Sequence, residues 1–497
     1  MQIKTEQFAE SAKAALKDTY TRSFLDGMSV KIKERLKSME TFPDPDAARE
    51  LGAAIRAEAV AKLPELLEEF EIKAKARGAR VVWARDATEA NRFIIELARQ
   101  NNISYVTKGK SMVSEEIGLN DALVANGIDV FETDLGEFII QLLERPPFHI
   151  VGPAINIPVE EIRDIFLQKN IIAKPTLDPV ELGYAARKFL RDKFQRLAMG
   201  ITGVNIAVAE TGTIINVENE GNIRFNKSSP KIQVSIMSLE KVVATMADAV
   251  HVLRLLCRNC TGQKLSAYVT LDNGPQAPDE IDGPEQLYIV IIDNGRSGFY
   301  ADPQAREVLR CIRCGACLAS CPVYTKIGGY PYGWAYSGPI GQLLNPLLLG
   351  LNRTGDLYRA STLCGSCKSV CPVGIDHPGL FLYFRSIDAS KTSSINGGRR
   401  PWLEPAFYAT WARIAGNAAN WNILNKILRP FINRYTQNGK LPKMIGPLDE
   451  WMKSRDFPQL PQQPFREKWK EMEFGSGPST SSDGSKVEGG KKKKLGR

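Results

Sequence analysis

This chain of 497 residues has no long apolar run, few histidines and no cysteine in its N-terminal half. It contains no stretch of about 18 or more apolar residues, so we expect no transmembrane helix. The start of the chain lacks the apolar core of a secretory signal, which predicts a cytoplasmic protein. With only three histidines, sites built from several imidazoles, such as bis-histidine haem sites, are not expected.

The composition is that of a folded protein, with 43% hydrophobic and 24% charged residues. At about 150 residues per domain, the length predicts two to four domains. Part of the net charge of +9 lies at residues 475–497, which are rich in glycine, serine and lysine. This composition predicts a flexible basic tail. Because no aromatic residues alternate with the lysines, nucleic acid is not an expected partner.

The cysteines are grouped rather than scattered. None occurs in residues 1–256, and without an export signal a disulfide framework is not expected. The first group reads Cys311-x2-Cys314-x2-Cys317-x3-Cys321-Pro, the bacterial ligand spacing for cubane iron–sulfur clusters. Zinc sites use paired C-x2-C knuckles and give no role to a fourth cysteine followed by proline. The motif therefore indicates an iron–sulfur protein.

A second, incomplete copy of this motif follows further along the chain. It reads Cys364-x2-Cys367-x3-Cys371-Pro, and Ser361 takes the position of its first cysteine. In two-cluster ferredoxins the fourth cysteine of each motif ligates the other cluster, which predicts two ligand sets. Cluster one receives Cys311, Cys314, Cys317 and Cys371, and cluster two receives Cys321, Cys364 and Cys367.

Cluster two is then one thiolate short of four, which leaves three outcomes open. It could be a [3Fe-4S] centre, a [4Fe-4S] centre with a serine or water oxygen, or a cluster completed by another residue. We favour a four-iron cluster with a non-cysteine or labile site. Clusters that share ligand motifs in this way lie within reach of electron tunnelling, so the pair predicts an electron-transfer path.

The two remaining cysteines, Cys257 and Cys260, form a lone C-x2-C at the end of a helix predicted over Met246–Leu256. They could be a redox or metal pair, or could donate the ligand that cluster two lacks. A lone C-x2-C is a weak signal, and small residues in a last helical turn explain it equally well. We favour this second interpretation.

An alternation of strands and helices precedes the cysteine motifs. Residues 1–78 predict helices with a break at Pro43 and Pro45, and the alternation begins after Gly78. It predicts an α/β fold with a largely parallel sheet. The expected strands are Arg80–Ala84, Ser104–Thr107, Asp129–Glu132, His149–Val151 and Gln286–Ile292, and the expected helices are Thr88–Gln100 and Ser114–Ala125.

Polar residues that follow these strands are candidates for catalysis. Lys108 and Lys110 lie where α/β sheets usually bind anionic ligands. Residues 200–222 read as two strands joined at a turn that contains Glu210. The lysines could bind a carboxylate substrate, with Glu210 or Glu132 as general base. Turn chemistry and a solvated face explain the same pattern, and we favour them.

The pattern becomes helical after residue 296. Residues 296–310 predict a helix that leads to the first cysteine group, and the long insert between the two groups suits a helical ferredoxin domain. From Pro401 to about Tyr435, aromatic residues recur at helical spacing. They favour packing against the chain's own domains over a partner-docking or membrane-surface face.

Taken together, these segments resemble the lactate-utilisation protein B family. The resemblance covers nearly all of residues 5–440. It is carried by both cysteine groups and by Val82–Asp86, Lys108–Asn120, Glu132–Glu137 and Gly203–Gly221. The family too has serine at the position of Ser361, whereas Cys257, Cys260 and the lysine-rich tail fall outside its pattern.

The resemblance implies a domain organisation and an activity. It implies a lactate-utilisation α/β domain, similar to sugar-phosphate isomerase and CoA-transferase folds, followed by a helical two-cluster ferredoxin domain. The expected boundaries are an N-terminal helical segment at 1–70, the α/β domain at 71–295, the ferredoxin domain at 296–395, a C-terminal helical region at 396–474 and the tail at 475–497.

The implied activity is electron transport during the oxidation of L-lactate to pyruvate, in which this chain is the iron–sulfur subunit. The implied partners are a subunit with cysteine-rich domains and a second subunit with a lactate-utilisation domain. Lactate oxidation releases two electrons whereas a cluster carries one. A two-electron acceptor is therefore expected, either a flavin or quinone on a partner or both clusters in concert. The alternative is that the α/β domain itself binds and oxidises lactate.

Overall fold

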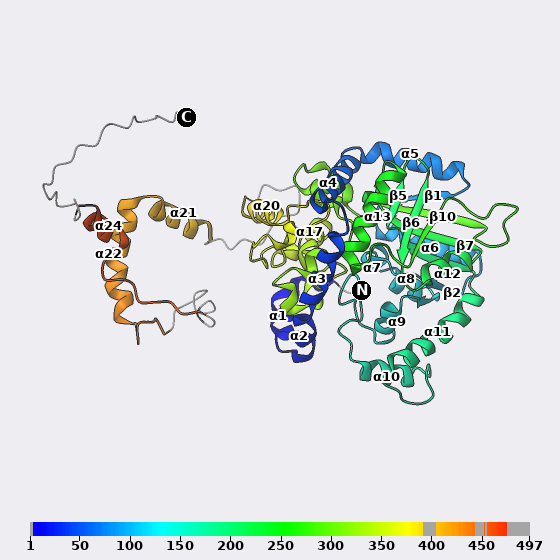
Figure 1. Cartoon of the computed structure of the whole chain (residues 1–497), viewed down its shortest axis with the longest axis horizontal. Helices are drawn as coiled ribbons and strands as arrows, with labels where there is room; N and C mark the ends of the chain where they lie inside the picture. The colour runs from blue at the N-terminus through cyan, green and yellow to red at the C-terminus, as the bar shows by residue number, and fades with distance from the viewer. Residues whose placement is uncertain (1–2, 391–403, 443–451, 453–454, 475–497) are drawn as a thin grey trace, which may run out of the picture. The chain divides into compact units, whose positions relative to one another are not determined.

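The computed structural model describes residues 3–390, 404–442, 452 and 455–474 (Figure 1). The chain forms two units, one ending at Arg399 and one beginning at Arg400. The expected boundaries near residues 70 and 295 therefore lie inside one compact unit. Across the described residues, no helix has the length and apolar character needed to span a membrane. The predicted tail at 475–497 lies outside the described residues.

The first unit is built around a parallel sheet with the strand order β1-β10-β7-β4-β2-β3. The predicted α/β class with a largely parallel sheet is confirmed, and the expected strands at 80–84, 129–132 and 286–292 have the predicted bounds. The six strands are β1 Arg80–Ala84, β2 Tyr105–Lys108, β3 Asp129–Glu132, β4 Met199–Gly203, β7 Ile232–Ser238 and β10 Gln286–Ile292.

The strands of this sheet are apolar on both faces because helices cover both sides. In β10, Ile289 and Ile291 face a core shared with α5 (Leu63–Ala76), whereas Val290 and Ile292 face a core shared with α6 (Ala87–Gln100) and α8 (Leu119–Ala125). Alternate residues of a strand point to opposite faces, so a continuous run of Val, Ile and Leu is what a strand buried on both sides requires.

A smaller sheet with the order β8-β5-β6-β9 packs on the same unit. The predicted strand pair near Glu210 is its antiparallel hairpin of β5 and β6. The hairpin turns at Gly212, where φ is +70° and a Cβ atom would lie 2.4 Å from the Ala74 backbone nitrogen, so only glycine fits. The strands are β5 Ile206–Val208, β6 Thr213–Glu218, β8 Val242–Val243 and β9 Tyr268–Asp272.

Two expectations for this region are wrong. His149–Val151 is not a strand, because side chains bond to the backbone there. His149 Nδ1 accepts the backbone N–H of Val151 at 3.0 Å, and the carbonyl of the preceding Phe148 accepts the hydroxyl of the distant Tyr324 at 3.1 Å. The single helix expected over 114–125 is two helices, α7 (Met112–Glu116) and α8. Gly118, with φ of +62°, separates them.

Helices from both ends of the first unit pack together (Figure 1). The helices α1 to α4 contact the segment after residue 296, with α4 on η3, α3 on α15 and α2 on α16. These N-terminal helices are α1 Phe8–Ala15, α2 Thr19–Asp26, α3 Met28–Met39 and α4 Pro45–Ala61. The later segment contains α14 Arg296–Ala301, η3 Ala305–Arg310, α15 Ala316–Ala319, α16 Tyr324–Ile327, η4 Tyr330–Tyr332, α17 Gly338–Leu349, α18 Leu351–Thr354, α19 Ser366–Ser369 and α20 His377–Ser390.

The remaining helices belong to the first unit or to the second. Those of the first unit are η1 Thr5–Gln7, α9 Leu135–Leu142, α10 Val159–Gln168, α11 Pro179–Gln195, α12 Asn222–Ser228, η2 Leu239–Lys241 and α13 Met246–Thr261. The second unit contains α21 Glu404–Ala415, α22 Ala418–Arg434 and α24 Phe465–Phe474. In α21 and α22 the aromatic side chains Phe407, Trp411 and Phe431 are exposed, so the structure does not show the packing expected for them.

A set of fully buried charges joins the main sheet to the segment that carries the cysteines. Glu116 of α7 accepts hydrogen bonds from Arg296 at 2.7 and 2.9 Å and from the Tyr336 hydroxyl at 2.6 Å. Glu240, which follows β7, lies 2.9 Å from Arg296 and 2.8 Å from Arg313. Burial opposes ionisation, but Arg296 and Arg313 lower the pKa of Glu240 to about 2. Glu240 is therefore ionised, and both carboxylates are paired with arginines.

We predict that Glu116→Gln destabilises the first unit by about 3–5 kcal/mol, because it leaves the buried Arg296 with one carboxylate fewer. Thermal unfolding of the full chain should show a lower midpoint. Glu89→Gln removes the exposed pair with Arg85 and should leave the midpoint unchanged. Equal midpoints for Glu116→Gln and wild type would show that the network does not stabilise the fold.

Candidate metal centres and an adjoining cavity

The two cysteine motifs fold into loops with the same backbone shape. In the first loop Arg313 has φ of +62° and Gly315 has φ of +75°, and in the second Leu363 has φ of +54° and Gly365 has φ of +81°. Each pair flanks a cysteine and precedes a short helix, α15 or α19. Side-chain-bearing residues seldom adopt positive φ, so its recurrence shows that the second motif is a structural copy of the first.

Ser361 takes the place of Cys311 in this copy. The Arg313 backbone N–H donates to the Cys311 sulfur at 3.4 Å, and the Leu363 backbone N–H donates to the Ser361 Oγ at 3.1 Å. Both bonds join the first position of a motif to the residue two places later. The serine hydroxyl is thus held where a complete motif would hold its first sulfur.

The thiols of the first predicted ligand set lie together in the interior. Cys314 and Cys317 are buried, and Cys311 and Cys371 are half-buried. Burial raises the pKa of Cys314 and Cys317, and charge on the Cys311 and Cys371 thiolates raises both further. Cys371, from the second motif, therefore lies within electrostatic reach of Cys314 and Cys317. Several thiolates in one region need a bound cation to offset their charge, which a metal centre supplies.

The second set lines a small cavity of its own. Its walls include Cys321, Cys364, Cys367 and Ser361. Cys364 is exposed, whereas the other two cysteines are buried, and burial together with the Cys321 thiolate raises the pKa of Cys367 to about 12. The chemistry of both donor sets fits an iron–sulfur centre, and the division of the cysteines into these two ligand sets stays a prediction.

A larger cavity lies beside the first set, between the sheet and the cysteine segment. Its volume is about 280 Å³, and its walls include Lys110, Lys241, Arg313 and both Cys257 and Cys260. Cys257 and Cys260 are absent from the walls of the smaller cavity. Their placement does not support the idea that they complete cluster two. Both lie inside α13, which extends past the predicted end at Leu256 to Thr261.

Of the candidate catalytic residues, only Lys110 reaches the larger cavity. Lys108 is fully buried at the end of β2, with its ammonium 2.7 Å from Glu132 and 2.9 Å from Glu115. Glu210 caps α13, since its carboxylate accepts the Met246 N–H at 2.9 Å. The structure thus does not bring Lys108, Lys110, Glu132 and Glu210 together as one substrate site.

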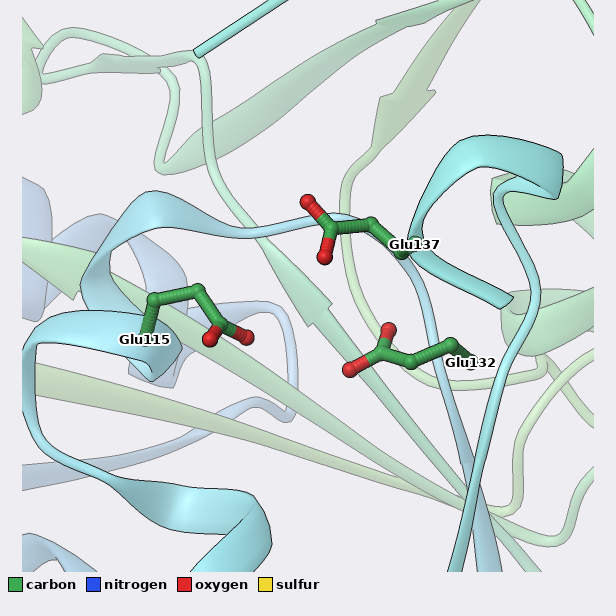
Figure 2. Close-up of side chains that lie close together, drawn as sticks. All are labelled: Glu115, Glu132 and Glu137. Atoms are coloured by element: carbon green, nitrogen blue, oxygen red, sulfur yellow. The ribbon is translucent and has the colours of Figure 1, made fainter. Parts of the chain in front are cut away.

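Three carboxylates converge around Lys108. Glu115, Glu132 and Glu137 point toward one another, and their oxygens lie within 4.8 Å (Figure 2). Burial raises the pKa of Glu137 well above its ordinary value, and charge on Glu115 and Glu132 raises it further. Lys108 already supplies a cation at this cluster, which favours a structural ion group over a further metal centre.

Sequence reasoning missed Glu116, Glu240, Lys241 and Arg296. None belongs to a catalytic or metal-binding motif, and their partners lie on distant segments. Glu240 and Lys241 closely follow a buried strand, and this position is the one signal that could have marked those two as candidates. Lys241 is the least expected of them, because it lines the larger cavity. Burial lowers its pKa to about 8, and the nearby Arg313 acts in the same direction.

Glu137 gives the stability of the chain a specific pH dependence. Its pKa is higher in the folded chain than in the unfolded chain, so its contribution is fully present at acidic pH and is lost as the pH rises above the ordinary value of 4.5. We predict that Glu137→Gln, which cannot ionise, shows a smaller loss of thermal stability between about pH 5 and 8 than wild type. Glu68→Gln, at an exposed site, is the control. Parallel pH profiles for Glu137→Gln and wild type would contradict the assignment.

Three family models match successive parts of the chain. They are the LUD domain over residues 67–292, the 4Fe-4S dicluster domain over residues 307–375, and the model called lactate utilisation protein B, C-terminal, over residues 387–473. The second match, together with the grouped cysteines, identifies iron–sulfur clusters as the cofactors of this chain, with [4Fe-4S] as the expected type.

The chain is also similar to a solved structure over part of its length and to relatives over nearly all of it. Among solved structures, a DUF162 family protein from Deinococcus radiodurans aligns with 46% of this chain and 98% of its own, at 16% identity and a TM-score of 0.27. Lactate utilization protein B of Bacillus cytotoxicus is 38% identical over 476 residues, which is 96% of this chain and 99% of the relative. The protein of the same name from Bacillus thuringiensis is 37% identical with the same coverage. The chain therefore belongs to the lactate utilization protein B family.

Proposed function

We propose that this chain is the iron–sulfur electron-transfer subunit of a cytoplasmic system that oxidises L-lactate to pyruvate. The observation that carries the proposal is the pairing of two cysteine loops of the same shape, whose thiols form two adjoining sets. The clusters, when bound, accept and release single electrons. The relatives' name, lactate utilization protein B, supplies the substrate.

The ligand sets that we propose follow the electrostatic grouping of the thiols. Cluster one is held by Cys311, Cys314, Cys317 and Cys371, and cluster two by Cys321, Cys364 and Cys367 with Ser361 Oγ at the remaining position. Charge on Cys367, in the second set, raises the pKa of Cys317 in the first. This electrostatic coupling supports an electron path between the two sets.

Backbone N–H groups of this chain adjust the charge on the sulfurs. Arg313, Tyr324 and Ile375 donate to Cys311, Cys321 and Cys371 at 3.4 to 3.5 Å. Hydrogen bonds to cluster sulfurs stabilise negative charge and raise the reduction potential. The buried first set and the more exposed second set should therefore differ in potential.

Lactate oxidation releases two electrons and two protons, so a two-electron acceptor is needed beside single-electron clusters. We propose that a flavin or quinone on a partner fills this role. The partners would be a subunit with cysteine-rich domains and a second subunit with a lactate-utilisation domain. Within this chain, residues 71–295 would form the lactate-utilisation domain and residues 296–395 the helical ferredoxin domain.

The first test is the cluster content of Cys314→Ser. We predict that the wild-type chain, purified without oxygen, holds about eight irons and eight sulfides. Cys314→Ser should lose cluster one and lactate-dependent electron flow in the assembled system, because a buried ligand is removed. Iron analysis and EPR spectroscopy after dithionite reduction measure this outcome.

Cys257→Ser is the matched control for this test, since Cys257 is a buried cysteine outside both ligand sets. It should keep the full iron content and the wild-type EPR spectrum. If Cys314→Ser also keeps both, Cys314 is not a cluster ligand. Reduction of the clusters by lactate in the absence of partners would favour the alternative, in which this chain itself oxidises lactate.

The second test concerns Ser361. Because its hydroxyl is held at the first position of the motif, we predict that Ser361→Cys keeps about eight irons and shifts the potential of cluster two, since the ligand type changes from oxygen to sulfur. Ser361→Ala should make one iron of that cluster labile, with an oxidised [3Fe-4S] EPR signal. About seven irons and that same signal in the wild-type chain would contradict a four-iron cluster two.

A further inference from the structure

The larger cavity lies where open α/β sheets usually bind ligands. The carboxyl ends of four neighbouring strands, β7, β4, β2 and β3, lead to residues of its wall. These residues are Lys241 after β7, Asn205 after β4, Lys110 after β2 and Asp134 after β3. At about 280 Å³, it is close to the lower size limit of small-molecule sites.

The opposite wall of this cavity belongs to the cysteine segment. Arg313, from the loop that holds the first ligand set, and Tyr336 both line it. The buried charge network holds these two side chains in place, since Arg313 pairs with Glu240 and the Tyr336 hydroxyl donates to Glu116. A ligand in the cavity would therefore lie between the sheet and the first cysteine group, on preformed walls.

Lys241 carries a charge that nothing in the described residues pairs with. It makes no hydrogen bond or ion pair there, although it lines the cavity and is half-buried. The neighbouring carboxylate, Glu240, is already shared by Arg296 and Arg313. A sheltered ammonium without an acceptor is costly, and a bound anion would remove that cost.

The acidic side chains of the cavity wall each accept backbone N–H groups, and Glu220 also lies within electrostatic reach of Lys110. Glu218 accepts from Ile223 and Arg224 at 2.6 and 3.0 Å. Glu220 accepts the Leu135 N–H and Asp134 the Glu137 N–H, both at 3.1 Å. The cations that remain for a ligand are Lys241 and Lys110, and the Lys110 ammonium donates to the Val151 carbonyl.

We propose that this cavity binds a small organic anion, whose carboxylate or phosphate group is held by the Lys241 and Lys110 ammonium groups beside the first cysteine group. The apolar side chains of Val204, Val217 and Ile223 on the same wall would contact the body of the ligand. The site is distinct from Lys108, Glu132 and Glu210, and it does not depend on lactate being the ligand.

Calorimetric titration of the full chain, purified without oxygen and with its clusters intact, tests the proposal. The probes are lactate, pyruvate, inorganic phosphate and flavin mononucleotide. Binding of the first two indicates a carboxylate site, and binding of the last two a phosphate site. We expect at least one probe to bind with a Kd below about 1 mM and Lys241→Met to weaken that binding about tenfold or more.

Lys231→Met is the matched control, because Lys231 precedes the same strand that Lys241 follows and is exposed. It should bind the probe as wild type does. Lys241→Arg, which keeps the charge, should retain most of the affinity. Lys110→Met provides a second variant if Lys241→Met fails to fold, and it too should weaken binding.

Two results would overturn the proposal. One is that no probe binds. The other is that Lys241→Met shifts only the midpoint potential of a cluster and leaves binding unchanged, which would make Lys241 a counter-charge for the cysteine thiolates. Iron content and EPR spectra of the same samples separate this outcome from the electron-transfer proposal. Intact clusters without anion binding would refute the anion site alone, and anion binding without clusters would refute the electron-transfer role alone.

Discussion

The buried ion network of Glu116, Arg296, Glu240 and Arg313 is the constraint on which the arrangement of the first unit depends. Each charge has almost no access to water, so each must keep its opposite partner. The two carboxylates belong to the α/β part and the two guanidinium groups to the segment after residue 295. Sheet and cysteine segment therefore cannot shift against each other without exposing unpaired charge. Arg56 of α4 adds to this by donating to the Val242 and Leu309 carbonyls.

Arg313 gives this constraint a functional consequence. Its guanidinium pairs with Glu240 and lies over the Tyr336 ring at 5.2 Å, its backbone N–H donates to the Cys311 sulfur, and its side chain lines the larger cavity. One residue thus contacts the charge network, a proposed cluster ligand and the proposed anion site. A charge bound near Lys241 would act on the first cysteine group through few intervening atoms and in a setting of low dielectric constant.

The sequence was most informative where structure is set locally. Strand positions such as Gln286–Ile292 follow from apolar runs. The ligand sets stay a prediction from cysteine spacing. The errors arise where contacts with distant segments of the chain determine the local structure. His149–Val151 is apolar enough for a strand, but Tyr324 takes one of its neighbouring carbonyls. Lys108 has the position of a ligand-binding residue, but Glu115 and Glu132 enclose it. The role of Glu116 or Lys241 depends on contacts that no local pattern encodes.

The burial of the two cysteine sets gives the proposed path a direction. The first set lies beside the larger cavity and includes the buried Cys314 and Cys317, whereas the second includes the exposed Cys364. Charge on Cys367 of the second set acts on Cys317 of the first. Electron transfer needs a short distance between donor and acceptor, so a partner would exchange electrons with the second set at the surface. The first set would exchange electrons inside the molecule. A serine at the first position of the second motif is then at the solvent-facing end of the path, where an oxygen ligand is easier to accommodate than in the buried first set.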